Sequence, residues 1–315
     1  MHILAATSFD GGVFFQQLEN GITIGAIYAL VSLGYTLVYG IIELINFAHG
    51  DVFMWSTIVT LTVAQALHIN QPLSGFALVG ALLLLLIIGM GTSALINVSI
   101  ERIAYRPLRK APRLVPLISA IAVSFILENV AQLWKGGGFL SYPSFFPDTS
   151  INIGSLSISV LDLLIIALAV GLMIALTQFI SRTRLGKAMR ATAQDPEAAA
   201  LMGVNINQTI SLTFIIGGAL AGAAGVIFSM KEHFVKFDSG FELGLVAFTA
   251  AVLGGIGNVT GAMLGGFLIG IVEALAIQYV PNGFAWDQAI VFGILILILI
   301  IRPSGLLGQQ VPDKV

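Results

Sequence analysis

The sequence contains no cysteine, so it can form neither disulfide bonds nor thiolate-ligated metal sites. It is also poor in charge, since only 10% of its 315 residues are Asp, Glu, Lys or Arg. A typical soluble domain carries about 25%. The net charge of −2 excludes the strongly basic surface of a nucleic-acid-binding protein. The scarcity of charge favours a protein that lies in a membrane.

Motifs for catalysis and for nucleotide binding are also missing. The four histidines are scattered without metal-ligand spacing, at His2, His49, His68 and His233. No phosphate-binding G-x-x-x-x-G-K-[ST] loop occurs, because Ala188 follows the single Gly-Lys pair, Gly186-Lys187. The sequence therefore predicts a chain that is not an enzyme, needs no cofactor or metal, and does not itself hydrolyse ATP through such a loop.

Long apolar segments dominate what is present, and 57% of the residues are hydrophobic. No Asp, Glu, Lys or Arg occurs in 20–42, 52–100, 163–181, 198–230 or 243–272. A helix needs about 20 apolar residues to cross the hydrocarbon of a bilayer. The pattern predicts an all-α, polytopic bundle of membrane helices that forms a single domain over residues 1–315.

We expect eight or nine crossings. The predicted spans are 20–41, 51–68, 74–99, 114–134, 161–181, 207–230, 244–257, 261–280 and 286–301. The turn between the second and third falls at 68–72, where His68 is followed by Ile-Asn-Gln-Pro. The segment 244–257 is short for a full crossing, which makes it a candidate half of a broken or re-entrant helix.

Basic residues orient the chain, because loops rich in Lys and Arg stay in the cytoplasm. One basic loop, 102–113, holds Arg102, Arg106, Arg109, Lys110 and Arg113, and a second holds Arg182, Arg184, Lys187 and Arg190. Two spans separate them, so 135–160 is expected outside, as is 231–243, and the C-terminus inside. The N-terminal segment has no Lys or Arg and is not oriented by this rule. The first loop either serves orientation alone or also contacts an acidic partner or lipid headgroups.

Two segments interrupt the apolar helices, near 45–51 and 254–258. The first reads Ile-Asn-Phe-Ala-His-Gly-Asp and the second Gly-Gly-Ile-Gly-Asn. Irregular backbone at membrane depth must be buried in protein or line a cavity, and paired breaks in two halves are typical of a transport pathway. Asn46, Gly257 and Asn258 are therefore pathway candidates. The 35 glycines fit close helix packing or helices that line a pathway.

Ionisable residues within spans are costly and are functional candidates by default. Glu128 and Glu273 are well embedded, and each either pairs structurally or lines a pathway. His49 and Asp51 lie in the first break, where they either close the loop by hydrogen bonds or face the pathway. Asp162 and Asp287 begin helices, where the interface can satisfy them.

The segment 182–205 follows the fifth span, and its second half has every signal of a very short helix. Asp195 can cap the first turn, Pro196 suits the first helical position and Glu197 suits the positive end of the helix dipole. Ala198 and Ala199 favour helix, and Gly203 can end it in the left-handed conformation. Isolated helices need about 12–15 residues to be stable in water, so this one must dock on another surface.

At these residues the chain resembles the permease subunits of ABC importers for branched-chain amino acids, the LivH type. The matching stretches cover most of the length: 20–30 (Asn-Gly-Ile-Thr-Ile-Gly-Ala-Ile-Tyr-Ala-Leu), 34–42, 45–50, 101–109, the segment 195–203 and 252–258. The resemblance implies that Asp195, Pro196, Glu197, Ala198, Ala199 and Gly203 form the cytoplasmic coupling segment that seats in the ATPase subunit.

The resemblance further implies a second permease subunit, two ATP-binding subunits and an extracytoplasmic substrate-binding protein, assembled in the cytoplasmic (inner) membrane among its lipids. The expected function is inward transport of Leu, Ile or Val. A permease for urea or short amides in the same family is the alternative. A stand-alone secondary transporter or channel is a further one, and a membrane-embedded enzyme is disfavoured by the missing catalytic cluster.

Overall fold

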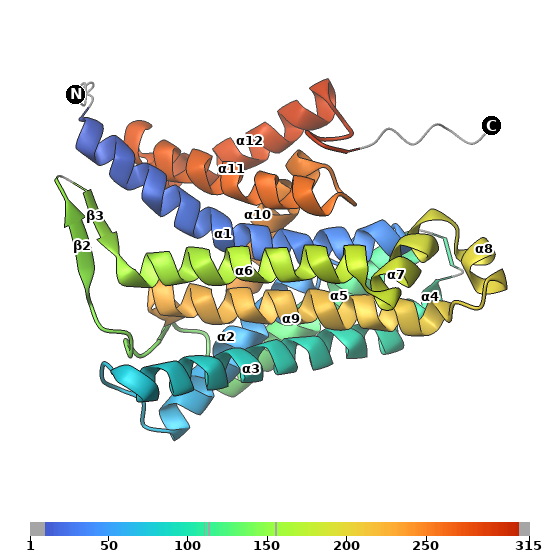
Figure 1. Cartoon of the computed structure of the whole chain (residues 1–315), viewed down its shortest axis with the longest axis horizontal. Helices are drawn as coiled ribbons and strands as arrows, with labels where there is room; N and C mark the ends of the chain where they lie inside the picture. The colour runs from blue at the N-terminus through green and yellow to red at the C-terminus, as the bar shows by residue number, and fades with distance from the viewer. Residues whose placement is uncertain (1–9, 110, 113, 155, 309–315) are drawn as a thin grey trace.

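A computed structural model describes residues 10–109, 111–112, 114–154 and 156–308 of the chain. The described residues form a bundle of helices, most of which run along its long axis (Figure 1). In chain order the elements are α1 (Gly11–Ile42), α2 (His49–Ala66), α3 (Gly75–Ile100), the π-helical turn η1 (Glu101–Tyr105), α4 (Arg106–Leu108), α5 (Leu114–Lys135), β1 (Leu140–Ser141), β2 (Ser150–Ile153), β3 (Leu156–Ser159), α6 (Val160–Arg182), α7 (Arg184–Gln194), α8 (Pro196–Leu201), α9 (Ile206–Glu232), β4 (Phe234–Val235), α10 (Ser239–Gly254), α11 (Val259–Tyr279) and α12 (Gly283–Ile301).

The predicted class, a polytopic helical membrane protein, is confirmed. In the described part of the chain, seven helices are long and apolar enough to cross a membrane. The two remaining predicted spans fall on α2, which has 18 residues, and on α10, which has 16. The predicted turn at 68–72 is also present, since α2 ends at Ala66 and α3 begins at Gly75.

Two segments that were expected as loops contain regular structure. The helix of α3 continues through η1 and α4 to Leu108, because Glu101 is buried there and forms an ion pair with Arg109. The segment 135–160 contains strands: β2 pairs antiparallel with β3, and β1 pairs with the distant β4. The basic residues Lys110 and Arg113 lie outside the described residues.

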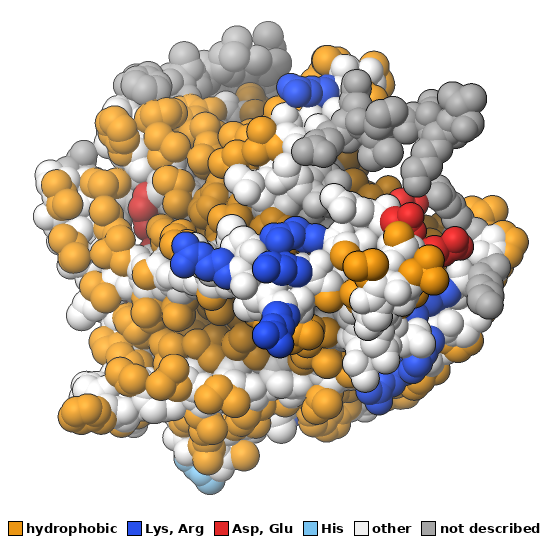
Figure 2. Space-filling model, turned by 45° about the vertical axis from the view of Figure 1, so that its right-hand side comes forward, with side chains coloured by type: hydrophobic (Ala, Val, Ile, Leu, Met, Phe, Trp, Pro, Cys, Tyr) orange, Lys and Arg blue, Asp and Glu red, His pale blue; other side chains and the backbone are white. Residues whose placement is uncertain are grey.

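The bundle has two different ends (Figure 1). We call the end that carries α4, α7 and α8 the basic end, and the end with the β2–β3 hairpin the hairpin end. Figure 2 turns the basic end forward and shows Lys and Arg gathered there, while apolar side chains cover most of the rest of that view. The helix α1 begins at the hairpin end, where the Gln16 side chain accepts a hydrogen bond from the Ser157 amide. The structure thus orients the first span, which the charge pattern alone does not.

Glycines let neighbouring helices touch through their backbones. Gly218 and Gly222 of α9 lie directly against α3, and Gly261 and Gly265 of α11 lie against α10. A side chain at any of these positions would overlap with backbone atoms of the neighbouring helix. These glycines therefore serve close packing. Gly257 does not belong to this contact and lies in the turn before α11, with a φ of 92°.

Candidate functional site

The short helix α8 has the local structure that its sequence predicts. One carboxylate oxygen of Asp195 accepts hydrogen bonds from the amides of Glu197 and Ala198, each at 3.0 Å. Pro196 is the first helical residue, and its missing N–H costs nothing at that position. Gly203 follows the helix with a φ of 86°. The helix is thus defined at both ends by its own residues.

The preceding helix, α7, holds α8 away from the bundle. Thr183 caps α7, since its hydroxyl accepts a hydrogen bond from the Gly186 amide at 2.9 Å. Gly186 lies so close to the backbone of α6 at Ile180 that a larger residue would overlap with it. Arg190 donates to the Ile180 carbonyl at 3.0 Å. The corner between α6 and α7 is therefore fixed, and α8 is presented at the basic end (Figure 1).

The apolar side of α8 is largely uncovered. Ala199 is buried, but Leu201 and Met202 are 88% and 86% exposed. These two large apolar side chains lie next to each other at a polar end of the molecule, and no other described residue covers them. This agrees with the expectation that a helix too short to be stable alone docks on another surface.

The first break in the helices covers 43–48, between α1 and α2, as predicted. Asn46 holds it in place, because its side-chain amide donates to Asn97 of α3 at 3.1 Å. The Tyr105 hydroxyl lies 3.0 Å from the backbone carbonyl oxygen of Ile45 and 3.3 Å from the side-chain oxygen Oδ1 of Asn46, and its single proton serves these two acceptors. Tertiary hydrogen bonds thus replace the helical ones that this segment lacks.

His49 and Asp51 do not close this break. Both side chains are fully buried, and neither has a hydrogen-bond partner of good geometry among the described residues. The His49 ring packs edge-on against Tyr35 of α1, with ring centroids 4.8 Å apart. The Ser124 hydroxyl of α5 is near enough to Asp51 to interact with it. Buried polar groups without well-formed hydrogen bonds are costly, so the burial of these two side chains lowers the stability of the fold.

The second break, 255–258, lies at the basic end, close to the last turn of α1, which leads into the first break. Asn258 closes it: the side-chain oxygen accepts from the Gly261 amide at 3.0 Å, and the side-chain nitrogen donates to the Leu307 carbonyl at 2.8 Å. Gly257 lies beside Gly40, near the end of α1, and shares a surface recess with Arg190 of α7. This break therefore connects α10 to α11 beside α7, the helix that precedes α8.

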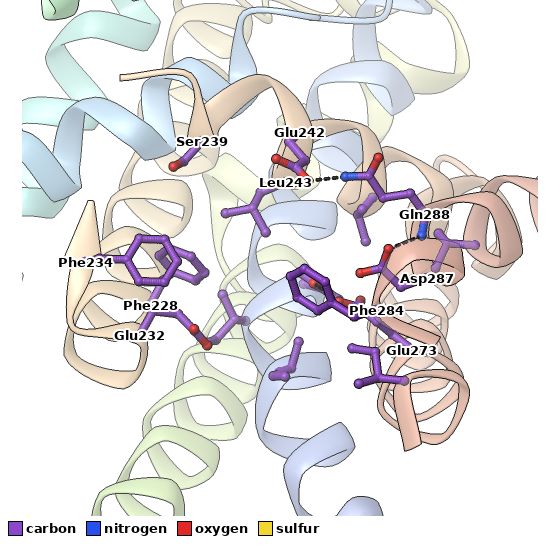
Figure 3. A pocket seen from close by; sticks show the side chains of 16 residues that line it. Phe228, Glu232, Phe234, Ser239, Glu242, Leu243, Glu273, Phe284, Asp287 and Gln288 are labelled. Carbon is purple, nitrogen blue, oxygen red and sulfur yellow. Dashed lines mark hydrogen bonds between the residues drawn. The ribbon is translucent and has the colours of Figure 1, made fainter. Parts of the chain in front are cut away.

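A cavity of about 260 Å³ lies between α1 and α9–α12. Four carboxylates line it, contributed by Glu232, Glu242, Glu273 and Asp287. Figure 3 shows Glu242 bonded to Gln288 across the cavity, and Phe228, Phe234 and Phe284 on its walls. The Tyr28 hydroxyl donates to Glu273 at 3.0 Å, and the second carboxylate oxygen of Glu273 is buried without a partner. The cavity combines aromatic and aliphatic walls with negative charge.

The predicted pathway residues are not brought together in one place. Asn46, His49 and Asp51 lie at the first break, Gly257 and Asn258 at the basic end, and Glu273 in the acidic cavity. Glu128 is partly buried on α5, in the half nearer the hairpin end. Sequence reasoning missed Glu232 and Glu242 as cavity residues, because the helices that carry the four carboxylates are joined only by tertiary packing.

Comparison with known proteins identifies the family of this chain. The model of the family described as branched-chain amino acid transport system / permease component matches residues 17–299. The chain belongs to this permease family. No solved structure matches it.

Curated relatives cover almost the whole permease. It is 42% identical over 310 residues to the high-affinity branched-chain amino acid transport system permease protein BraD of Pseudomonas aeruginosa, with 96% of this chain and 98% of the relative covered. It is 41% identical over 307 residues to the LivH permease protein of Escherichia coli K12, with the same coverage. The autoinducer 2 import system permease protein LsrC of Enterobacter is more distant, at 26% over 287 residues, 87% of this chain and 77% of the relative.

Proposed function

We propose that this permease is the membrane-spanning subunit of an ABC importer that moves Leu, Ile or Val into the cytoplasm. Two relatives that are 41% and 42% identical to the chain over nearly its full length carry names of high-affinity branched-chain amino acid transport systems. The basic end then lies in the cytoplasm, as the positive-inside rule requires, and the hairpin end lies outside. The membrane is the cytoplasmic (inner) membrane.

One observation carries the coupling role: α8 is capped at its start, ended by Gly203, and left with two apolar side chains exposed at the basic end. In our proposal these side chains seat in a groove of an ATP-binding subunit. Asp195, Pro196, Glu197, Ala198, Ala199 and Gly203 give the helix its shape. ATP binding must favour one conformation of the permease over the other, because only a difference in affinity can drive a switch.

The acidic cavity is our candidate for part of the substrate pathway. A branched-chain amino acid has an apolar side chain and an ammonium group. The cavity has apolar walls, including Ile27 and Val246, together with the partly unpaired carboxylate of Glu273. Small-molecule sites are typically mostly apolar with a few polar groups that orient the ligand.

The proposed assembly contains a second permease subunit, two ATP-binding subunits that hydrolyse ATP, and an extracytoplasmic substrate-binding protein. The segments 135–160 and 231–243, at the hairpin end, are the proposed contact for the binding protein. The permease itself performs no hydrolysis in this scheme. The binding protein would set the substrate, so its affinity for Leu, Ile and Val against urea distinguishes this proposal from a urea or amide importer.

The coupling role is tested with Gly203→Val and Glu197→Lys in the assembled transporter. A Cβ at Gly203 meets no atom within 4 Å, so valine introduces no clash and changes only the backbone preference at a φ of 86°. We expect membrane insertion to be normal and uptake per ATP hydrolysed to fall in both variants. Normal uptake in both variants would contradict the coupling role.

A further inference from the structure

A row of buried polar side chains runs along α3 and η1 at intervals of four residues. Its members are Ser93, Asn97, Glu101 and Tyr105, and each is at most 1% exposed. We call this row the polar seam. A spacing of four places all of them on one side of the helix, and the π-helical turn η1 falls within the row. Such turns occur frequently at functional sites.

At the basic end, the polar seam bonds to the first turns of α9. The two carboxylate oxygens of the fully buried Glu101 have different partners: one pairs with Arg109 and the other accepts from the Ser211 hydroxyl at 2.7 Å. Arg109 also donates to the Asn207 side chain at 2.7 Å. Asn207 and Ser211 therefore attach the start of α9 to a buried charge. Only the turn 202–205 separates that start from α8.

Three other members of the polar seam bond to the first break and to the start of α2. Asn97 donates to the Phe214 carbonyl of α9 at 2.7 Å and accepts from Asn46 at 3.1 Å. The Tyr105 hydroxyl contacts Ile45 and Asn46. Ser93 donates to the Val52 carbonyl in the first turn of α2 at 2.8 Å. One row of residues thus contacts both the element that follows α8 and the backbone that leads to His49 and Asp51.

These contacts resist partial separation. A hydrogen bond in a water-free interior is strong, and a group left without its partner there is costly. Gly218 of α9 touches the backbone of α3 between Ser93 and Asn97, and Gly222 touches it one turn earlier, at Gly89. A displacement of the start of α9 therefore either carries the polar seam along or breaks a buried, charge-assisted contact.

We propose that the polar seam transmits movement of α8 to the first break, with Ser211 and Glu101 as positioning residues for transport. This inference rests on the proposed coupling role of α8 and goes beyond it by naming the path inside the permease. The path is a contiguous network of packed and bonded groups between two sites, and networks of this kind carry coupling between distant sites.

The test uses Ser211→Ala combined with Asn207→Ala, because this change removes the two side-chain bonds from the start of α9 to the Glu101–Arg109 pair and leaves that pair intact. Alanine favours helix, so α9 is expected to fold. Ser99→Ala combined with Gln208→Ala is the matched control. Among the described residues, the Ser99 hydroxyl bonds only within its own helix and Gln208 donates only through its backbone. Uptake and ATP hydrolysis are measured in proteoliposomes that contain the complete transporter.

We expect the first pair to lower uptake per ATP on the order of fivefold, with ATPase activity and assembly unchanged, because residues along such networks modulate coupling by about 0.5–2 kcal/mol. The control should stay within twofold of the unmodified transporter (about 0.4 kcal/mol). Loss of assembly or of ATPase activity together with uptake would show a merely structural role and overturn the inference. An unchanged ratio of uptake to ATP hydrolysis in the Ser211→Ala, Asn207→Ala variant would overturn the inference as well.

Tyr105→Phe removes only the hydroxyl that contacts the first break, and it completes a double-mutant cycle with Ser211→Ala. If both residues act on one path, the double variant should be no more uncoupled than the worse single variant. Independent, multiplying effects would contradict a shared path. Gly203→Val in the same assay separates the two proposals: if it uncouples while the seam variants do not, only the seam fails, and if it has no effect, the coupling role of α8 fails.

Discussion

Replacing Asp195 with alanine tests whether the shape of α8 determines coupling. The Asp195 carboxylate accepts hydrogen bonds from the backbone amides of Glu197 and Ala198, each at 3.0 Å, and these hydrogen bonds are exposed to solvent. Loss of such a cap typically costs about 1 kcal/mol of helix stability. A helix of six residues has little stability of its own to absorb that cost. We therefore expect the ATP-binding subunit to bind the variant up to about fivefold more weakly.

The matched control is Asp195→Asn, because asparagine caps a helix about as well as aspartate but carries no charge. Purified ATP-binding subunit is titrated onto the permease in proteoliposomes, and the concentration for half-maximal uptake is measured. We expect a rise of up to about fivefold for alanine and little change for asparagine. Added ATP-binding subunit should restore the maximal rate in the alanine variant.

Two outcomes would contradict this mechanism. If alanine leaves the half-maximal concentration unchanged, the capped helix is not what the ATP-binding subunit recognises. If asparagine is as damaging as alanine, the charge of Asp195 matters and its cap does not.

Two further predictions follow from the packing and the orientation of the bundle. Gly270→Ala should prevent stable folding, because the added Cβ would overlap with the backbone of α1 at Gly25. Gly293→Ala, whose added Cβ meets no atom within 4 Å, should leave the thermal unfolding temperature in detergent nearly unchanged. The chain has no cysteine, so single cysteines report orientation without background. A membrane-impermeant maleimide should label Gly11→Cys and Asn152→Cys in intact cells but Leu201→Cys only after permeabilisation, and labelling of Leu201→Cys in intact cells would contradict the assigned orientation.

The sequence predicts those parts of the fold that depend only on residues close together in the chain. The cap, the first-turn proline and the terminal glycine of α8 lie within nine residues of sequence, and each acts on its neighbours alone. The length of the uncharged segments likewise predicts the membrane spans, because the thickness of the bilayer sets how many residues a helix needs to cross it. Both breaks were visible as Gly- and Asn-containing interruptions of apolar sequence.

Features that depend on tertiary packing could not be predicted in this way. The helix was expected to end near residue 99, because Glu101 and the arginines after it look like an interfacial loop. The helix continues because α9 supplies Ser211 and Asn207 to a buried Glu101–Arg109 pair. The acidic cavity was missed for the same reason, since no sequence spacing relates Glu232 to Asp287. The contacts of the second break with α1 and α7 also depend on tertiary packing.

The most direct measurement is uptake of labelled leucine into proteoliposomes, with and without the ATP-binding subunits, in the presence of the second permease subunit and the loaded binding protein. We expect uptake only when the ATP-binding subunits and ATP are both present, and we expect Gly203→Val to abolish most of it. Uptake by the permease without ATP-binding subunits, driven by an ion gradient, would contradict the assignment and identify a secondary transporter instead.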